Sequence, residues 1–204
     1  VGDDNINKKI NLLKSAKYII KNRNINKIAA NLIYSGKIIG RVAGNAEFGA
    51  RALGNRSILA DPSKIEIKKI INEKIKNRDF WMPFAASILA SHASKYFKLN
   101  SEIASYSYMT NCVESTKLGE KNLIAALHPY DMTCRPQILS KGINPGYENL
   151  ILEFGRRSGI FGLLNTSFNI HGKPLVNNFN DTIKVFKETD LDAVIIDNYI
   201  LIKK

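Results

Sequence analysis

Residues 38–60 read IIGRVAGNAEFGARALGNRSILA. The apolar ends of this stretch predict two strands, Ile38–Ala43 and Ser57–Ala60, joined by a loop that carries glycines. Within the loop, two arginines, two glycines, a carboxylate, an amide and a hydroxyl fall between Glu47 and Ser57. Glycine lets a backbone approach a ligand closely, and the planar guanidinium fits a phosphate edge. The stretch therefore predicts a sheet protein whose inter-strand loop binds an anion; a surface loop with ion pairs from Glu47 to Arg51 or Arg56 is the alternative.

The rest of the chain mixes helical and strand patterns. Apolar residues three and four apart predict two helices within residues 5–37, broken near residues 22–26, and further helices over 62–77, 147–158 and 181–187. Strand-like runs cover 107–113, 123–127, 133–139, 161–164 and 193–202, the last with a turn at 197–198, and residues 84–90 form a buried run. This mixture predicts an α/β (α+β) fold in a single domain.

The composition limits the partners. The chain has 204 residues, 45% of them hydrophobic, and a formal charge of +12, which suits nucleic acid, a membrane surface or small polyanions. Many lysines lie in Ile/Lys/Asn-rich helices and indicate solvated faces, whereas the arginines lie beside glycine, proline and asparagine, as in phosphate sites. No run is long and apolar enough for a membrane span, and the acidic N-terminus does not resemble a secretory signal, so we expect a cytoplasmic protein. Cys112 and Cys134 lack a CxxC pattern and are expected to be buried free thiols, without zinc or a disulfide.

Three further stretches carry polar chemistry. Lys76 and Arg78, if extended, point to the same side and reach one anion together; a helix C-terminus that is cationic is the alternative. In residues 128–137, HPYDMTCRPQ, the side chains at 131, 133, 135 and 137 alternate onto one face, either as the lining of a cleft or as the polar side of an edge strand. In residues 163–174, LLNTSFNIHGKP, an apolar strand runs into amides and hydroxyls, which indicates a pocket for a small amide or carbamate, or an Asx-rich turn.

Taken together, these four stretches resemble the C-terminal domain of the carbamoyltransferase family that includes NodU and the cephamycin and tobramycin O-carbamoyltransferases. The patterns EFGxRALGNRSILADP, Asp-x-Thr-x-Arg-x-Gln and LLNTSFNxxGxP occur in the family's order, and the similarity covers roughly Gly40 to Lys203. The domain is in turn similar to YrdC-like proteins, which make carbamoyl adenylates. The resemblance implies a YrdC-like twisted mixed sheet flanked by helices over residues 38–204, with residues 1–37 a helical lead-in or linker from a missing domain.

The resemblance also implies a reaction. Carbamoyl phosphate would lose its phosphate to give carbamate, which would attack the α-phosphorus of ATP to form carbamoyl adenylate, with Mg²⁺ accompanying ATP. A Kae1-like N-terminal domain, in cis or as a subunit, would pass the carbamoyl group to a hydroxyl acceptor. Its metal ion is not expected here, because His92, His128 and His171 are scattered. The chain then corresponds to an excised domain or a separate subunit, and its sequence does not name the acceptor.

The same resemblance assigns candidate site residues. The catalytic candidates, which would hold phosphate oxygens, are Arg51, Lys76, Arg78 and Arg135. The substrate-binding candidates, for carbamoyl phosphate and ATP, are Arg56, Asn55, Asn165, Thr166, Ser167 and Asn169. No general base is expected, since carbamate is already an anion, and no metal ligand is assigned.

Two departures from relatives bear on activity. Met82 stands where many relatives have arginine and Ala86 where they have proline. If that arginine touches a phosphate, this chain binds the substrate more weakly or uses Arg78 instead. Two other classes of function stay open: a basic RNA-binding domain, which we do not favour because aromatic and basic residues do not alternate along a strand, and a non-catalytic docking subunit.

Overall fold

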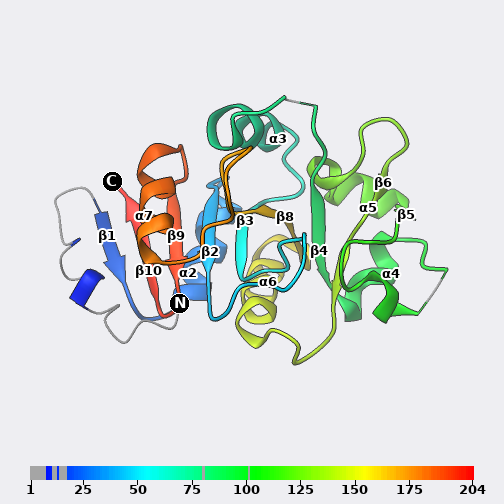
Figure 1. Cartoon of the computed structure of the whole chain (residues 1–204). Helices are drawn as coiled ribbons and strands as arrows, with labels where there is room; N and C mark the ends of the chain where they lie inside the picture. Colours follow the sequence, from blue (N-terminus) through cyan, green and yellow to red (C-terminus); the bar gives the residue numbers. More distant parts are fainter. Residues whose placement is uncertain (1–7, 11–12, 14–17, 80, 101) are drawn as a thin grey trace.

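The computed structural model describes residues 8–10, 13, 18–79, 81–100 and 102–204. Their framework is one mixed eight-stranded sheet in the order β1-β10-β9-β2-β3-β8-β4-β7 (Figure 1). The strands are β1 (Tyr18–Lys21), β2 (Ile39–Val42), β3 (Arg56–Ala60), β4 (Ala85–Leu89), β7 (Gln137–Leu139), β8 (Gly162–Ser167), β9 (Ala193–Ile196) and β10 (Tyr199–Lys203). A separate ladder joins β5 (Val113–Glu114) to β6 (Thr133–Cys134). The predicted α/β class and mixed sheet are confirmed.

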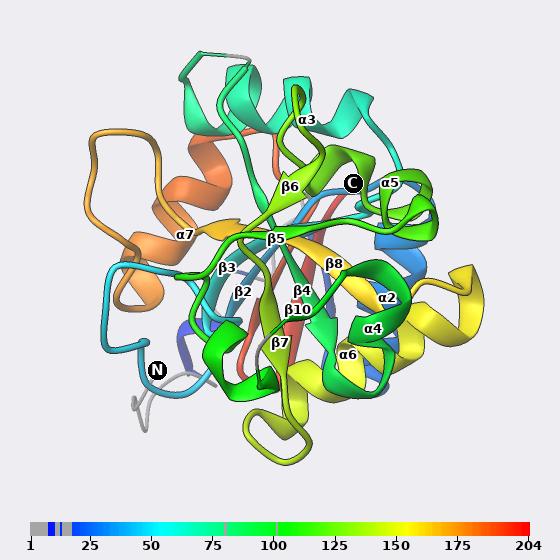
Figure 2. The same ribbon diagram turned by 90° about the vertical axis from the view of Figure 1, so that its right-hand side faces the viewer.

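Helices cover both faces of the sheet. They are α2 (Ile25–Tyr34), α3 (Glu66–Ile70), α4 (Ala93–Tyr96), α5 (Lys117–Asn122), α6 (Pro145–Ser158) and α7 (Phe179–Glu188), with a π-helical turn η1 (Ile71–Lys76) and 3₁₀ turns η2 (Ala90–His92), η3 (Ile103–Tyr106) and η4 (Ile124–Ala126). In the view of Figure 2, α2 and α6 lie on one side of the strands and α7 on the other. Among the described residues, no helix has the length and hydrophobicity of a membrane span.

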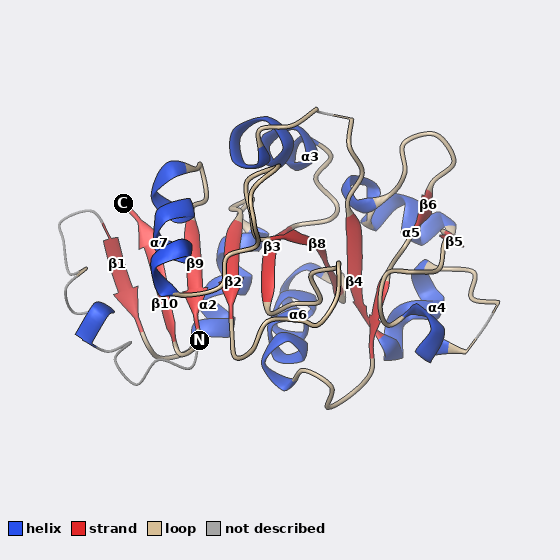
Figure 3. Ribbon diagram, in the orientation of Figure 1, coloured by secondary structure: helices blue, strands red, loops and turns tan. Residues whose placement is uncertain are grey.

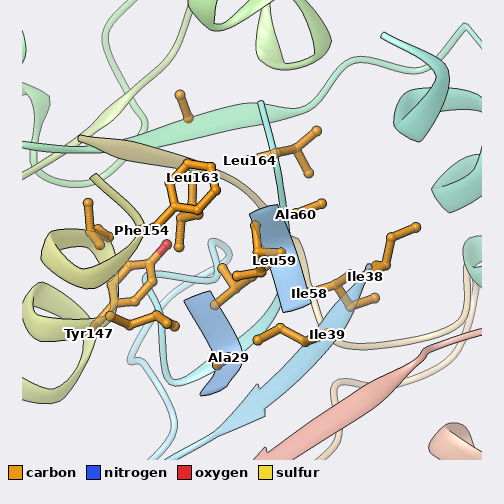
Figure 4. Close-up of a cluster of buried hydrophobic side chains, with 14 of the residues drawn as sticks. Ala29, Ile38, Ile39, Ile58, Leu59, Ala60, Tyr147, Phe154, Leu163 and Leu164 are labelled. Carbon is orange, nitrogen blue, oxygen red and sulfur yellow. The ribbon is translucent and has the colours of Figure 1, made fainter. Parts of the chain in front are cut away.

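Helix α6 shows why the sequence builds this architecture. Asn144 caps its first turn by accepting the Tyr147 N–H at 3.2 Å, Pro145 opens the helix, and Gly159 ends it with φ of 77°. Tyr147, Leu150, Ile151 and Phe154, at helical spacing, are all buried. Figure 4 shows Tyr147 and Phe154 packed against the side chains of β2, β3 and β8. Helix α6 thus contributes to the hydrophobic core on one face of these strands.

The N-terminal segment differs from its predicted helical structure. Tyr18–Lys21 form strand β1, which pairs antiparallel with β10. Its four residues alternate between half-buried and exposed, as the period of an edge strand requires. The second predicted helix is confirmed as α2, while much of the first lies outside the described residues. Residues 18–34 thus contribute an edge strand and a helix to the same domain.

Two predicted strands between β4 and β7 are wrong. Residues 107–113 contain a turn at Met109, where φ is 57°, and only Val113 joins a strand. Residues 123–127 contain the 3₁₀ turn η4, whose Ala125 N–H donates to the Pro62 carbonyl at 2.9 Å. A short apolar run does not distinguish a strand from a buried helical turn. Figure 3 shows this part of the chain as loops and short helices beside β4.

The predicted strand at 133–139 is divided. Its ends are β6 and β7, in different sheets, because Pro136 lacks the N–H that a continuous ladder needs. The helix predicted over 62–77 occurs as α3 and η1, and it ends at Asn77, which has φ of 52°. The closing strands and their turn are confirmed as β9 and β10.

Candidate functional site

A cavity of about 500 Å³ is lined by residues from all four polar stretches. It is lined by Ala50, Arg51, Ala52, Arg78, Pro83, Phe84, Ala85, Met109, Cys112, His128, Asp131, Thr133, Cys134, Arg135, Asn165, Thr166 and Ser167. The sheet explains why these stretches lie together. Strand β8 pairs with β3 on one side and with β4 on the other, and Asn165 lies opposite both Leu59 and Ala85. Arg51, Arg78 and Arg135, predicted from three separate stretches, thus line one cavity with Asn165, Thr166 and Ser167.

The three arginines have different environments. Arg51 and Arg135 are exposed and form no hydrogen bond or ion pair with the described residues. Arg78 is half-buried; its Nε donates to Asn72 Oδ1 at 2.7 Å, and its guanidinium lies 4.9 Å from the centre of the Phe84 ring. Burial lowers the pKa of Arg78, and one terminal nitrogen of its guanidinium is buried without a partner in the described structure. A buried donor of this kind is suited to an anion in the cavity.

Lys76 lies behind the cavity rather than on its surface. Its Nζ donates to the Ser167 carbonyl at 2.7 Å, to Ser167 Oγ at 3.0 Å and to Asn169 Oδ1 at 2.6 Å. Burial, and then the charge of Arg78, lower the pKa of Lys76 to about 7. The expectation that Lys76 and Arg78 are extended is wrong, because Lys76 ends a helical turn and Asn77 follows it with φ of 52°. That the two side chains reach one anion together stays a prediction. Lys76 and Asn169 thus support Ser167, which lines the cavity.

Arg56 and Asn55 also lie outside the cavity lining. Arg56 is 2% exposed, and its terminal nitrogens donate to the carbonyls of Ala43, Gly44, Asn55 and Asn177 at 3.0–3.3 Å. Asn55 Oδ1 accepts from Asn144 at 2.8 Å and from Arg41 at 3.3 Å. Both side chains fix the loop between β2 and β3, residues 43–55, to the end of β2 and to the start of α6. A direct role of Arg56 and Asn55 in ligand binding stays a prediction.

Glu47 organises the loop from inside. Its Oε1 accepts the N–H groups of Leu53, Asn55 and Arg56 at 2.7, 2.6 and 3.2 Å. The expected alternative, ion pairing with Arg51 or Arg56, is not what holds this loop among the described residues. Three N–H groups on one oxygen curl the loop and leave Arg51 projecting at the cavity.

A buried polar network lies under the cavity floor. Asn165 Nδ2 donates to the Ala52 carbonyl at 3.0 Å and to Ser87 Oγ at 2.9 Å. Ser87 Oγ donates to Gln137 Oε1 at 2.6 Å, and Gln137 Nε2 donates to the Leu53 carbonyl at 2.9 Å. Gln137, expected on the same face as residues 131, 133 and 135, therefore lies in this network and not among the lining residues.

Sequence reasoning missed the His128–Asp131 pair at the cavity. The His128 ring nitrogen Nδ1 lies 3.1 Å from Asp131 Oδ1, which also accepts the Thr133 N–H at 3.0 Å and its hydroxyl at 2.8 Å. The pKa of Asp131 is lowered, mainly by the hydrogen bond that its carboxylate accepts from the Thr133 backbone N–H. The His-x-x-Asp spacing at a turn could have signalled this pair. Cys134 is buried as expected, but Cys112 is exposed, which corrects the expectation for that thiol.

The cavity is poor in metal ligands. Asp131 is the one carboxylate among the lining residues that the structure describes, and no cluster of three or more His, Cys, Asp or Glu side chains is found within the described ranges. Divalent cations prefer several oxygen ligands. The donor set fits an anionic ligand that brings its own cation better than a metal held by protein.

A family model described as Carbamoyltransferase C-terminus matches residues 30–203. The chain belongs to the carbamoyltransferase family, as a C-terminal region. This carbamoyltransferase region is 40% identical over 176 residues to the nodulation protein NolNO of Sinorhizobium fredii, covering 86% of this chain and 26% of that protein. It is 30% identical over 148 residues to the 3'-hydroxymethylcephem-O-carbamoyltransferase of Amycolatopsis lactamdurans, covering 72% and 27% of the two chains. It thus spans about a quarter of each of these relatives.

The fold resembles that of P. abyssi Sua5, solved in complex with L-threonine. The TM-score is 0.56 with 16% identity, over 84% of this carbamoyltransferase region and 46% of that chain. At this identity the similarity shows the fold alone. The expected YrdC-like architecture is confirmed, and so is the family resemblance.

Proposed function

We propose that this carbamoyltransferase region activates the carbamoyl group: it takes carbamoyl phosphate and ATP and forms carbamoyl adenylate. The observation that carries the proposal is the convergence of Arg51, Arg78 and Arg135 on one cavity. Phosphoryl and nucleotidyl transfer depend on alignment and charge neutralisation more than on a covalent nucleophile. The cavity offers cationic and neutral donors for both acyl phosphate and triphosphate.

The proposed chemistry has two balanced steps. Water cleaves carbamoyl phosphate into carbamate and inorganic phosphate, releasing a proton. A carbamate oxygen then forms a bond to the α-phosphorus of ATP, while the bond from that phosphorus to the oxygen bridging to the β-phosphorus breaks and pyrophosphate leaves. Arg51 and Arg135 bind phosphate oxygens, and Arg78 adds a partly buried donor. Ser167, whose hydroxyl accepts from Lys76 and donates to Asn169, binds a further oxygen by turning its proton from Asn169 to the ligand. Mg²⁺ enters with ATP as its counter-ion.

Two walls of the cavity support a nucleotide. Phe84, Pro83 and Met109 give it an apolar side that suits a flat base, and the arginines give it a cationic side. Transfer to a hydroxyl acceptor is assigned to a Kae1-like domain, since the relatives are three to four times as long as the matched region. The docking-only alternative predicts the same fold without ligand binding.

The proposal is tested by exchange of labelled pyrophosphate into ATP, which we expect only when carbamoyl phosphate is present. Arg51→Ala and Arg135→Ala should each lose roughly 2 kcal/mol of binding free energy, the scale of a charge-assisted contact. Arg156→Ala, an exposed arginine of α6 paired with Glu153, is the matched control and should retain exchange. Binding of RNA that weakens steeply with salt, without exchange, would instead support the nucleic-acid alternative.

A further inference from the structure

The amide of Asn165 is held in one orientation by a one-way relay of hydrogen bonds. The relay has a backbone carbonyl at each end, and a carbonyl only accepts. At one end, Leu53 O requires a donor, so Gln137 turns its Nε2 toward it and its Oε1 toward Ser87. Ser87 therefore donates its single proton to Gln137 and accepts from Asn165 Nδ2.

The other end sets the same direction independently. Ala52 O, 3.0 Å away, also requires the Nδ2 of Asn165 as donor. Both protons of Nδ2 are thereby used, with Gln137 Oε1 a longer third contact at 3.4 Å. The amide cannot rotate by 180° without placing its oxygen against a carbonyl oxygen, which costs a buried hydrogen bond.

One atom of this network has no partner. Asn165 is 1% exposed and lines the cavity, and its Oδ1 is buried without a hydrogen bond among the described residues. Buried acceptors are rarely left unpaired, because desolvation costs free energy that nothing returns. Because Nδ2 is turned toward Ala52 and Ser87, we take Oδ1 as the atom of Asn165 that is left for a ligand in the cavity, where it would accept an N–H or O–H group.

Its surroundings identify that group. The Asn165 amide donates to the carbonyl of Ala52, the residue after Arg51. Asn165 is also the register partner of Ala85 on the neighbouring strand β4, and the residue before Ala85 is Phe84, whose ring contacts the guanidinium of Arg78. Arg51 and Arg78 line the same cavity as Asn165, so a ligand that brings an N–H donor to this amide is best carried by an anion. We propose that Asn165 Oδ1 accepts the NH₂ of carbamoyl phosphate and makes the site selective for carbamoyl over acetyl groups; this inference rests on the proposed function.

The relay gives Ser87 and Gln137 a positioning role. They are not among the cavity-lining residues, but together with the Ala52 carbonyl they hold the Asn165 amide in one orientation. Acetyl phosphate is the diagnostic probe, because a methyl group replaces NH₂ at nearly the same size and cannot donate. A site built to bond an N–H rejects the analogue that lacks it far more strongly than its size difference explains.

The test is equilibrium titration of the chain with carbamoyl phosphate and with acetyl phosphate at low temperature. We expect acetyl phosphate to bind at least about 10-fold more weakly, as the loss of one buried hydrogen bond requires. In Asn165→Leu the two affinities should converge, and Ser87→Ala should narrow the ratio between them in part, because the Ala52 carbonyl alone then opposes rotation of the amide. Asn180→Leu, an exposed position of α7, should leave it unchanged.

The outcomes separate the two levels of the proposal. Equal binding of the two phosphates by the unmodified chain overturns the selectivity of Asn165 and leaves the proposed function standing. Titration with ATP and inosine triphosphate tests the amino group of adenine, which inosine lacks. If Asn165→Leu removes a preference for ATP but keeps the preference for carbamoyl phosphate, then Asn165 binds adenine and the inference is wrong. Binding of neither carbamoyl phosphate nor ATP would remove the proposed function itself. Should Asn165→Leu fail to fold, the unmodified chain and Ser87→Ala still decide.

Discussion

At the scale of single residues, the polar groups divide into those that face the cavity and those that hold the first group in place. Arg51 and Arg135 face the cavity, whereas Glu47, Arg56 and Gln137 form their hydrogen bonds with backbone groups or within the buried network. The sequence places Arg51 and Arg56 in one stretch with the same chemistry. Only the fold distinguishes a ligand-facing guanidinium from one that binds four carbonyls.

Glu47 gives a prediction about the loop. Glu47→Ala removes the acceptor of three N–H groups, so we expect faster hydrogen exchange at Leu53, Asn55 and Arg56, and a loss of about 1–3 kcal/mol in unfolding free energy. Glu148→Ala is the control, because Glu148 accepts one N–H, from Gly142, in another loop. Unchanged exchange at the three amides would show that the glycine turns hold the loop without the carboxylate.

Lys76 gives a prediction about pH. Its folded pKa of about 7 lies below the ordinary lysine value of 10.5, so between these values the unfolded chain binds a proton that the folded chain does not. The free energy of unfolding should therefore rise with pH from about 7 toward 10.5, by up to about 1.4 kcal/mol per pH unit from this residue. The difference between denaturation of the native chain and of Lys76→Met, across pH, isolates it. A flat difference would mean that Lys76 stays protonated when buried.

At the scale of elements, the patterns with strong periodicity were predictable and the short ones were not. Helix α6 and the strands β2, β3 and β8 follow from apolar spacing and end signals, and the strands bring the loop with Arg51 next to Asn165. In the cavity wall contributed by residues 107–135, the alternation of Asp131, Thr133 and Arg135 predicted a cleft lining, and these residues do line the cavity. The course of residues 107–127 was not predictable, because two-residue strands and 3₁₀ turns carry no period. The His128–Asp131 pair, at a turn in the same wall, was missed.

A substitution at Gly155 tests how tightly α6 packs against the chain that follows it. In an exposed helix interior, Gly→Ala stabilises by roughly 1 kcal/mol. Here a Cβ on Gly155 would lie 2.4 Å from the Phe161 ring, so Gly155→Ala should instead destabilise by about 1–3 kcal/mol, as overpacking does. Asn149→Ala, on the exposed face of α6, is the control and should stabilise slightly. Chemical denaturation measures both; a stabilised Gly155→Ala would show that the Phe161 ring moves aside freely.

At the scale of the whole molecule, the sheet separates two tasks. The cavity is lined by Ala85 of β4 and by residues 165–167 of β8, toward one end of the strand order, while β1 closes the other end by pairing with β10. The N-terminal segment supports this end through Ile10, which is 2% exposed, and through Tyr18, whose ring lies 5.6 Å from that of Phe186. Ligand binding and closure of the sheet edge should therefore be separable.

Deletion of residues 1–23 tests this separation. It removes β1, so β10 becomes an edge with unpaired N–H and carbonyl groups, which favours pairing between chains. We expect a loss of about 2 kcal/mol or more in unfolding free energy from the lost apolar contacts and concentration-dependent association in sedimentation velocity. Affinity for carbamoyl phosphate should stay within about twofold, since independent sites add with small errors. Deletion of residues 1–7, which keeps β1, is the matched control. A folded, monomeric deletion variant that no longer binds carbamoyl phosphate would show that the far edge of the sheet shapes the cavity after all.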